Sequence, residues 1–347
     1  MGKSRSITGE KAMIAALRRR LPTADSFKFG IRVGIGDDGA ILDPPRGHSI
    51  VVTTDFSLET IHFRREWHSP ESVGHRCLAR GLSDLAAMGA NPLAAFLSLA
   101  LPAELIKGNP SWRDRFLDGF LVLAKRFRIP LAGGDTAQSP SLAANKRTNG
   151  LALADIIAIG SVPPGRALLR SGAKPGDRIY VTGFLGGAAA ELRQLEANLR
   201  KFRNCKSGPT ENPNPHPHLF PEPRINVGEW LSKNRKATAA IDLSDGLSTD
   251  LNHICEESQL AATIDAAAIP VHPLAKKTDS SGPLQLALHG GEDYELLFTV
   301  SPNLRIPRII SGVPIAPIGT MRRHTARLPR ILLIDEKSQK SALKPDR

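Results

Sequence analysis

Acidic residues recur in this sequence directly beside short apolar segments. The chain of 347 residues carries five such motifs: GIGDDGA at 34–40, TTD at 53–55, LSD at 82–84, GGDT at 133–136 and DLSDG at 242–246. Buried carboxylates without partners are costly, so these side chains must lie in open turns or contact a cation. Carboxylates placed repeatedly at the ends of apolar segments indicate a cage of oxygen ligands for hard divalent cations.

The glycines of the first motif match a dinucleotide-binding fingerprint, but their context argues against it. Gly34, Gly36 and Gly39 have the G-x-G-x-x-G spacing, which should open a helix whose N-terminus faces a pyrophosphate. Here two prolines follow at 44–45 and stop any helix. Asp37 and Asp38 would also repel the phosphates directly, so we interpret the motif as an acidic turn.

The LSD motif falls near the end of a predicted helix. Ser69 and Pro70 form a helix start, a capping hydroxyl followed by proline at the first helical position, and apolar residues recur at helical spacing up to Met88. A carboxylate near the C-terminal end of a helix is disfavoured by the helix dipole. Asp84 therefore needs a nearby cation.

Predicted strands place the other acidic motifs. Strand patterns cover 49–54, 93–101, 129–132, 151–162, 178–182, 237–243 and 330–334, and helical patterns also cover 8–21, 110–126, 188–200 and the segment after 246 to about 257. TTD, GGDT and DLSDG each stand at the end of one of these strands. The glycine-rich loop 183–187 either binds phosphate at the next helix or packs that helix closely on its strand.

Length and composition indicate a two-domain globular protein. The chain has 41% apolar residues, and the run PPG at 163–165 predicts a boundary between an N-terminal domain, 1–162, and a C-terminal domain, 163–347. Three cysteines without metal-site spacing favour a reducing compartment, so we expect a cytoplasmic protein. No apolar run reaches the length of a membrane span, and no apolar signal region is present at the N-terminus.

The formal net charge of +12 raises the possibility of nucleic-acid binding. Much of the excess lies after Ser301, in a segment whose last residues, 338–347, are expected to be frayed. No RNA-binding signature or basic stripe interleaved with aromatics is present. We therefore prefer a solvated basic surface that attracts anionic substrates, and keep a nucleic-acid-binding protein, with tight and salt-sensitive duplex binding, as the alternative from another class.

Taken in order, the motifs resemble those of the thiamine-monophosphate kinase family. They are GIGDD, TTD with His62 behind it, LSDLAAMGA at 82–90, GGDT, LLRSGAKPGD at 168–177, IDLSDG at 241–246 and HGGEDYEL at 289–296. Single motifs are shared with aminoimidazole ribonucleotide synthetase and selenophosphate synthetase. The combination of LSDLAAMGA with GGEDYEL is more specific to the kinase family. His289 stands where serine is usual.

The resemblance implies a fold and an activity. The fold is α/β (α+β), with two domains as in aminoimidazole ribonucleotide synthetase. The sheet of the N-terminal domain pairs with that of a second subunit and closes a barrel, so a homodimer is expected. The activity is transfer of the ATP γ-phosphoryl group to thiamine monophosphate. An ATP-dependent enzyme of the same superfamily with a different acceptor is the alternative.

The residue chemistry agrees with a kinase of this kind. The sequence has neither a Walker A motif nor a protein-kinase catalytic loop. A phosphate monoester acceptor is mostly ionised near neutral pH, with a second pKa of about 6, so no general base is required. The barrier is then mainly repulsion between two polyanions and alignment of the attacking oxygen, and several carboxylate-bound Mg²⁺ ions would lower both contributions.

Site residues follow from the resemblance, motif by motif. For the Mg²⁺ ions it implies Asp38, Thr53, Thr54, Asp55, Asp84, Asp135, Asp242 and Asp245, with the two threonines acting partly through backbone or hydroxyl oxygens. For ATP it implies Gly134, Asp135, Arg170 and Ser244. For thiamine monophosphate it implies His62 and Glu292, the latter beside the aminopyrimidine or the thiazolium. Asp37 is expected to lie next to the metal ligands without binding an ion itself.

The sequence departs from the family pattern near its end. Members usually carry an aromatic residue there that packs on the thiamine, whereas no aromatic residue follows Phe298. The loops at 143–150 and 204–222 also look longer than usual. Within the second loop, His216 and His218 could bind a metal, but no third ligand lies nearby in the sequence, and we expect both to be exposed.

Overall fold

The computed structural model describes residues 30–107, 111–140, 150–197, 214–277 and 282–345. The helix expected over 8–21 lies outside these residues. The chain forms two compact units. Unit 1 holds the described residues up to Gly81 together with Pro92–Ser161, and unit 2 holds Leu82–Asn91 and the described residues from Val162 onward.

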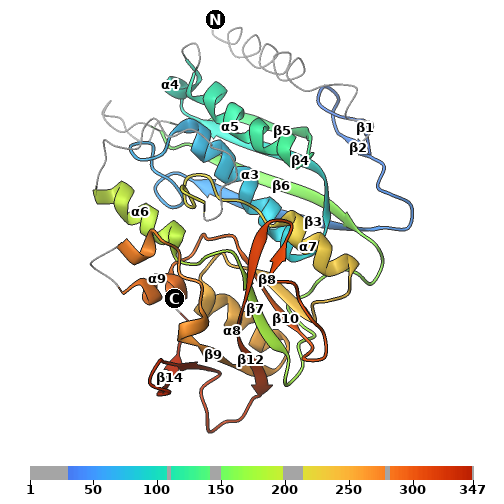
Figure 1. The fold of residues 1–347 in the computed structure, drawn as a ribbon. Helices are drawn as coiled ribbons and strands as arrows, with labels where there is room; N and C mark the ends of the chain where they lie inside the picture. The colour runs from blue at the N-terminus through green and yellow to red at the C-terminus, as the bar shows by residue number, and fades with distance from the viewer. Residues whose placement is uncertain (1–29, 108–110, 141–149, 198–213, 278–281, 346–347) are drawn as a thin grey trace, which may run out of the picture. The chain divides into compact units, whose positions relative to one another are not determined.

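A four-stranded sheet with helices on one face forms unit 1 (Figure 1). Its strands, in spatial order, are β3 (Ser49–Leu58), β6 (Leu153–Val162), β4 (Asn91–Leu101) and β5 (Leu131–Gln138). The helices are α3 (Pro70–Ala87), α4 (Ala103–Ile106) and α5 (Trp112–Arg126), and a separate hairpin joins β1 (Ile31–Val33) and β2 (Ile41–Leu42). The expected strand and helix patterns of this region are thus present as elements.

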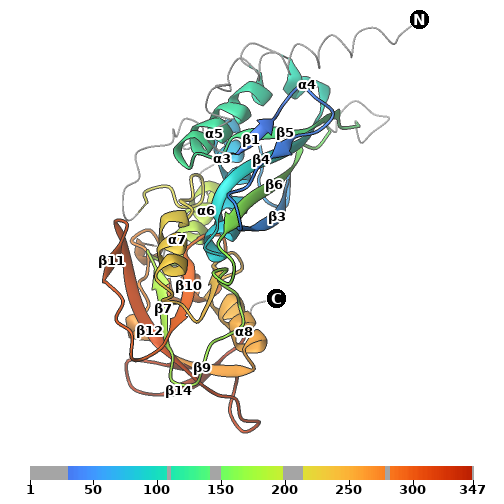
Figure 2. The same ribbon diagram turned by 90° about the vertical axis from the view of Figure 1, so that its right-hand side faces the viewer.

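Helices α3 and α5 cover one face of this sheet (Figure 2). Strand β6 alternates between buried and half-buried residues, as expected for a sheet covered on one side. Helix α5 begins with a capping box, in which the Ser111 hydroxyl accepts from the Asp114 backbone N–H and the Asp114 carboxylate accepts from Ser111 N–H. Phe116 and Phe120 on its inner face are fully buried.

Apolar side chains also project from the opposite face, at the edge strand β3. Val52 and Phe56 are 61% and 60% exposed, and Ile50 is 45% exposed. These positions alternate along the strand and therefore lie on one face. Unit 1 thus presents an apolar sheet face that its described helices do not cover.

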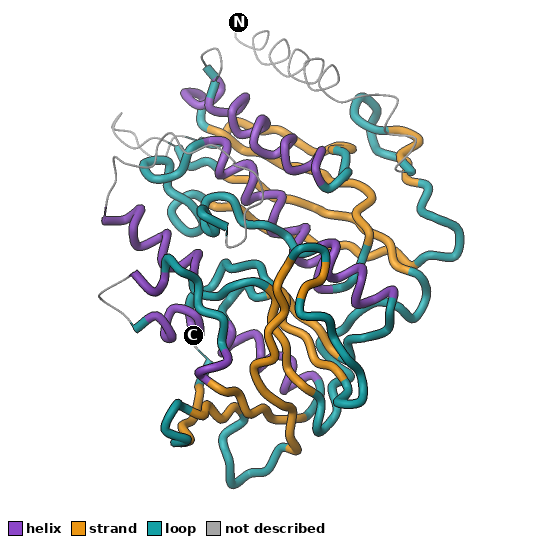
Figure 3. Tube along the Cα trace, viewed as in Figure 1, coloured by secondary structure: helices purple, strands orange, loops and turns teal. Residues whose placement is uncertain are grey.

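A larger mixed sheet forms unit 2 (Figure 3). Its strands, in spatial order, are β14 (Lys340–Leu343), β13 (Ile331–Ile334), β9 (Leu260–Asp265), β12 (Val313–Arg323), β7 (Arg178–Thr182), β10 (Leu296–Val300) and β8 (Ala239–Asp242), with β11 (Ile309–Ile310) paired to β12. The helices are α6 (Gly187–Ala197), α7 (Ile225–Lys233), α8 (Leu247–Glu257) and α9 (Pro283–His289), with single turns η2 (Ala266–Ala268) and η3 (Ala275–Lys277). Leu251 and Ile254 of α8 pack into the sheet core with Val181 and Ile241. The architecture of both units confirms the α/β fold class.

Several elements of unit 2 differ from the sequence expectations. Residues 338–345 are not frayed throughout, because Lys340–Leu343 pairs with β13. Helices α7 and α9 and strands β9 and β12 were not anticipated. Strand β12 contains Pro314 and Pro317, which argue against a central strand, and its register shifts between Pro317 and Gly319. Within the described residues, none of the helices has the length and apolar character that crossing a membrane requires.

Candidate active site

The TTD motif lies inside strand β3, not at its end as expected. Strand alternation places Thr53 and Asp55 on one face and Thr54 on the other. An Asp55 carboxylate oxygen lies 3.4 Å from Nη2 of Arg80 on α3, and its side chain is 25% exposed. The Thr54 hydroxyl donates to Asp155 Oδ1 across 2.9 Å. The Thr54 hydroxyl is therefore directed to the face of the strand opposite the Asp55 carboxylate.

The GIGDD motif forms an exposed loop between β1 and β2, as expected. Both Asp37 and Asp38 are exposed, and the Asp38 backbone N–H donates to Asp37 Oδ1 at 2.9 Å. This contact holds the Asp37 carboxylate against its own loop. The Asp38 side chain is exposed, so it remains accessible to an added cation.

The GGDT motif lies within the edge strand β5 and not behind it. Gly134 has φ +148° and pairs with Leu97 of β4, whose carbonyl oxygen would lie 1.9 Å from an added Cβ. A side chain at this position is excluded. Asp135 follows, exposed, with one carboxylate oxygen accepting from the Thr136 N–H at 2.7 Å. The glycine at 134 is therefore required for the close pairing of β5 with β4 next to Asp135.

His62 follows β3 in a short turn. Its Nδ1 accepts from the Leu58 backbone N–H at 3.0 Å, and its carbonyl oxygen accepts from Arg76 Nη2 at 3.2 Å. Because Nδ1 is an acceptor, the neutral ring carries its proton on Nε2. His62 is thereby set up as a hydrogen-bond donor, which suits a phosphate oxygen.

In unit 2, the DLSDG motif follows β8 and starts α8. Asp242 is the last residue of β8 and is only 4% exposed, and its Oδ2 accepts from the Ser83 hydroxyl at 2.7 Å. Ser83 precedes Asp84, which is half-buried in the last turns of α3. Residues 82–91 belong to unit 2, so the LSD and DLSDG motifs meet within one unit through this contact.

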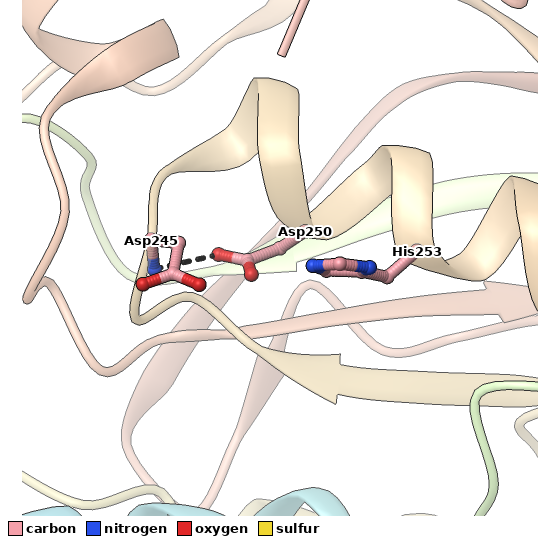
Figure 4. A group of neighbouring side chains, drawn as sticks. All are labelled: Asp245, Asp250 and His253. Atoms are coloured by element: carbon pink, nitrogen blue, oxygen red, sulfur yellow. Dashed lines mark hydrogen bonds between the residues drawn. The ribbon is translucent and has the colours of Figure 1, made fainter. Parts of the chain in front are cut away.

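Three side chains gather at the start of α8, as Figure 4 shows. The ligand atoms of Asp245, Asp250 and His253 lie within 4.8 Å of one another. The Asp245 backbone N–H donates to Asp250 Oδ2 at 3.1 Å. Burial, the largest cause, and the nearby charges of Asp242 and Asp245 together raise the pKa of the Asp250 carboxyl to about 8. A bound divalent cation would reverse this effect by favouring the ionised carboxyl.

Sequence reasoning found Asp242 and Asp245 but missed Asp250, His253 and Ser83. The sequence did contain a signal for two of these residues. Asp250 and His253 are three residues apart on a predicted helix, a spacing that places both on one face. The Ser83 contact had no such signal, because it joins residues 159 positions apart.

The Ser244 and Glu292 segments are joined by backbone contacts. The Glu292 N–H donates to the Ser244 carbonyl oxygen at 2.8 Å. An added Cβ on Gly291 would lie 2.5 Å from the same oxygen, so the glycine permits the approach. Glu292 has φ +66°, a rare conformation for a residue with a side chain. Strain of this kind is typical of functional sites.

The glycine-rich loop 183–187 does not present an open phosphate site. The Asp293 carboxylate accepts from Gly186 N–H at 2.7 Å and from Ala188 N–H at 3.1 Å, and so covers the N-terminus of α6. Burial raises the pKa of Asp293 to about 7, while these backbone donors act in the opposite direction. Of the two alternatives for this loop, the structure therefore favours packing.

Arg170 lies exposed in the segment before β7, where its carbonyl oxygen accepts from the Ser258 hydroxyl at 3.2 Å. The expected exposure of His216 and His218 was wrong. His218 is 1% exposed, and His216 is half-buried with Nδ1 2.8 Å from Glu191 Oε1. Neither histidine belongs to the described metal-ligand cluster at Asp245.

Comparison with known proteins gives consistent matches. Residues 36–162 match the family model "AIR synthase related protein, N-terminal domain". The thiamine-monophosphate kinase of Salmonella typhimurium is 38% identical over 322 residues, covering 90% of each chain.

Two solved structures match as well. The thiamine-monophosphate kinase of Stenotrophomonas maltophilia K279a has a TM-score of 0.76 and 31% identity, covering 96% of this chain and 97% of that one. AaThiL complexed with AMPPCP and TMP has a TM-score of 0.69 and 27% identity, covering 89% of this chain and 90% of that one.

Proposed function

This chain belongs to the thiamine-monophosphate kinase family, and from this membership we propose that it transfers the γ-phosphoryl group of ATP to thiamine monophosphate. The product is thiamine diphosphate. The resemblance drawn from the ordered motifs is confirmed by the 38% identity over 322 residues. The observation that carries the proposal on the structural side is the group of carboxylates around Asp242, Asp245 and Asp250.

The donor set of this group fits Mg²⁺. Carboxylate oxygens are the preferred ligands of hard divalent cations, and Asp245 and Asp250 offer theirs within reach of one another. Burial of these like charges without a cation raises the pKa of Asp250. We propose as Mg²⁺ ligands Asp242, Asp245 and Asp84 of unit 2, with Asp38, Thr53, Thr54, Asp55 and Asp135 of unit 1. When bound, the ions would neutralise charge on the phosphoryl oxygens.

The chain's own residues then bind and align the two substrates. Arg170 and Ser244 contact ATP, and an exposed guanidinium suits a phosphate fork. Gly134 and Asp135, which both lie on β5, also contact ATP. His62, with Nδ1 already occupied by Leu58 N–H, donates from Nε2 to the acceptor phosphate. Glu292 pairs with the cationic thiamine. No general base is needed, because the attacking phosphate oxygen is already ionised.

We propose a homodimer that completes the metal site. Asp55 lies on β3 and Asp135 on β5, the two edge strands of the four-stranded sheet. Three strand spacings separate them, about 14 Å between backbones, which is too far for both to ligate one ion within one subunit. Pairing of β3 with β5 of a second copy would bring the two carboxylates together. The same pairing would close a barrel over the exposed face of Val52 and Phe56.

The other partners follow from the proposed reaction. We propose a cytoplasmic enzyme that acts on small anionic molecules and binds neither nucleic acid nor membrane. The division into functional domains at 162/163 also remains a prediction. The excess of basic residues after Ser301 is then a solvated surface.

A second candidate is an enzyme of the same superfamily with another phosphate or acyl acceptor. The absence of an aromatic residue after Phe298 favours it, since the family's stacking partner for thiamine is missing. This candidate would turn over ATP without responding to thiamine monophosphate.

Incubation of the purified protein with ATP, Mg²⁺ and thiamine monophosphate tests the proposal, with thiamine diphosphate followed by chromatography. Formation of product that requires Mg²⁺ is expected. Asp55→Asn should lower kcat by about 100-fold or more, since a charge-stabilising group is lost. Asp43→Asn, which removes an exposed carboxylate paired with Arg32, is the matched control and should keep activity. ATP turnover without thiamine diphosphate would favour the second candidate.

A further inference from the structure

The segment Asn214–Arg224 is anchored by one buried carboxylate, that of Glu191 on α6. Oε1 of Glu191 lies 2.8 Å from His216 Nδ1. Oε2 accepts from the backbone N–H groups of His218, at 2.7 Å, and of Leu219, at 3.2 Å. Glu191 itself is 1% exposed. Three contacts to a single buried group hold the centre of the segment in one conformation.

A second anchor holds the end of the same segment. Arg224 pairs with the buried Glu295 through two guanidinium nitrogens, with Nε 2.6 Å from Oε2. The Thr182 hydroxyl also donates to Glu295. At the start of the segment, the Asn214 side-chain amide donates to the Phe220 carbonyl oxygen at 2.7 Å. The segment is therefore fixed at its start, centre and end.

This fixed segment places His218 against Glu292. Nδ1 of His218 lies 3.2 Å from Oε2 of Glu292. The His218 side chain is 1% exposed, whereas the Glu292 side chain is 24% exposed. The Glu292 backbone is held in turn by its N–H contact to the Ser244 carbonyl oxygen. A buried ring thus contacts one oxygen of a carboxylate that remains open to solvent.

We propose that His218 is a positioning residue that orients the Glu292 carboxylate toward the cationic ring system of the acceptor substrate. This inference rests on the proposed function, which assigns Glu292 to thiamine monophosphate. With Nδ1–H donating to Oε2, the carboxylate loses rotational freedom before the substrate binds, and less entropy is lost on binding. His218 therefore sets affinity for the acceptor and leaves affinity for ATP unchanged.

Steady-state kinetics at pH 8 test the inference, with KM measured separately for thiamine monophosphate and for ATP. His218→Leu keeps a side chain of similar size but removes the donor. We expect it to raise KM for thiamine monophosphate by about 10-fold, as for loss of one hydrogen bond to a charged group, with KM for ATP within about twofold. His218→Asn places an amide N–H near the position of Nδ1 and should restore most of the affinity.

His216→Gln is the matched control, because it alters the same segment and the same Glu191 anchor without touching Glu292. It should leave KM for thiamine monophosphate within about twofold of wild type, a change too small for a lost charged hydrogen bond. An equal rise of KM in His216→Gln and His218→Leu would overturn the inference, because it would mean general loosening of the segment.

A double-variant comparison keeps the inference testable where His218→Leu lowers stability. In a Glu292→Gln background, His218→Leu should add nothing further to KM for thiamine monophosphate. An additional rise of about 10-fold would show that His218 acts independently of Glu292 and overturn the inference. Wild-type protein that neither phosphorylates nor binds thiamine monophosphate by calorimetry would instead overturn the proposed function and this inference together. Wild-type activity with an unchanged KM in His218→Leu overturns the inference alone.

Discussion

Carboxylates of unit 2 are held close together by neutral donors, and this arrangement has an electrostatic consequence. Asp242 accepts from the Ser83 hydroxyl, and Asp250 accepts from the Asp245 backbone N–H. These donors orient the oxygens but supply no positive charge. Burial and the two neighbouring carboxylates therefore raise the pKa of Asp250 to about 8. A divalent cation supplies the missing charge and should stabilise the folded protein.

Asp245→Asn tests this at the level of a single residue. Added MgCl₂ should raise the Tm of the wild-type protein, since saturation at 100 times Kd contributes about 2.7 kcal/mol. Asp245→Asn should lose at least half of this Mg²⁺-dependent rise, measured by differential scanning fluorimetry with and without EDTA. Glu257→Gln, at the exposed end of the same helix, should retain it. An equal rise in Asp245→Asn would mean that the ion binds elsewhere.

At the scale of elements, α3 and α5 cross so closely that two glycines are required. A Cβ on Gly119 would lie 1.9 Å from the Glu71 carbonyl oxygen, and a Cβ on Gly74 would lie 1.9 Å from that of Phe116. Arg115 and Glu71 form a bidentate ion pair beside the crossing, at 2.7 and 3.0 Å. The glycines thus fix the separation of the two helices that cover the sheet of β3 and β5.

Gly119→Ala should therefore destabilise the protein by roughly 3 kcal/mol, as overpacking in a core does. Urea unfolding followed by circular dichroism measures the change. Gly39→Ala, in an exposed loop, is the control, because its added Cβ meets nothing within 4 Å, and it should be near neutral. A Gly119→Ala variant as stable as wild type would show that α5 can shift without cost.

The segment around His216 predicts a pH dependence of stability. The hydrogen bond to Glu191 raises the pKa of His216 above its ordinary value, against a smaller opposing effect of burial. Because the folded pKa is the higher one, the stabilisation is fully present below the unfolded pKa of about 6.5 and is lost as the pH rises through the folded pKa.

The difference in Tm between wild type and His216→Gln should accordingly be larger at pH 6 than at pH 9. Thermal unfolding across this range measures it, with His253→Gln as a second histidine variant outside the segment. A difference in Tm that is constant with pH would mean that folding does not shift the pKa of His216.

At the scale of the whole molecule, the exposed apolar face of β3 needs a partner. Ile50, Val52 and Phe56 lie on one face of an edge strand, and edge strands of this kind pair with other chains. The proposed homodimer uses this face and places Asp135 of one copy near Asp55 of the other. Catalysis should then depend on assembly.

Val52→Glu should convert the dimer to monomers and lower activity together, because a buried unpaired carboxylate is costly at the centre of an interface. Analytical ultracentrifugation over a range of concentrations measures the association. Val122→Glu, at an exposed apolar residue of α5, is the control and should leave association unchanged. A monomeric wild type with full activity would contradict the shared site.

The amino-acid sequence by itself predicted many of the local elements and singled out most of the residues that we propose for the site. The segment that became α3 could be predicted because apolar residues recur at helical spacing when one face of a helix is buried, and the segments that became β3 and β6 could be predicted as short apolar runs. The acidic motifs could be recognised because carboxylates beside apolar segments are costly unless they lie in open turns or contact a cation. Strand β12 could not be predicted, because its two prolines argue against a strand. Its pairing with β7 and β9 stabilises it, and that pairing is visible only in the structure.

Tertiary structure alone decided which of these residues meet. The strand order places Asp55 and Asp135 on opposite edges of one sheet, although each motif looks equivalent in the chain. The Ser83–Asp242 hydrogen bond and the His218–Glu292 contact join residues far apart in sequence. Local sequence patterns encode the conformation of a segment, whereas strand order and side-chain contacts depend on the packing of the entire unit, and no short pattern records them.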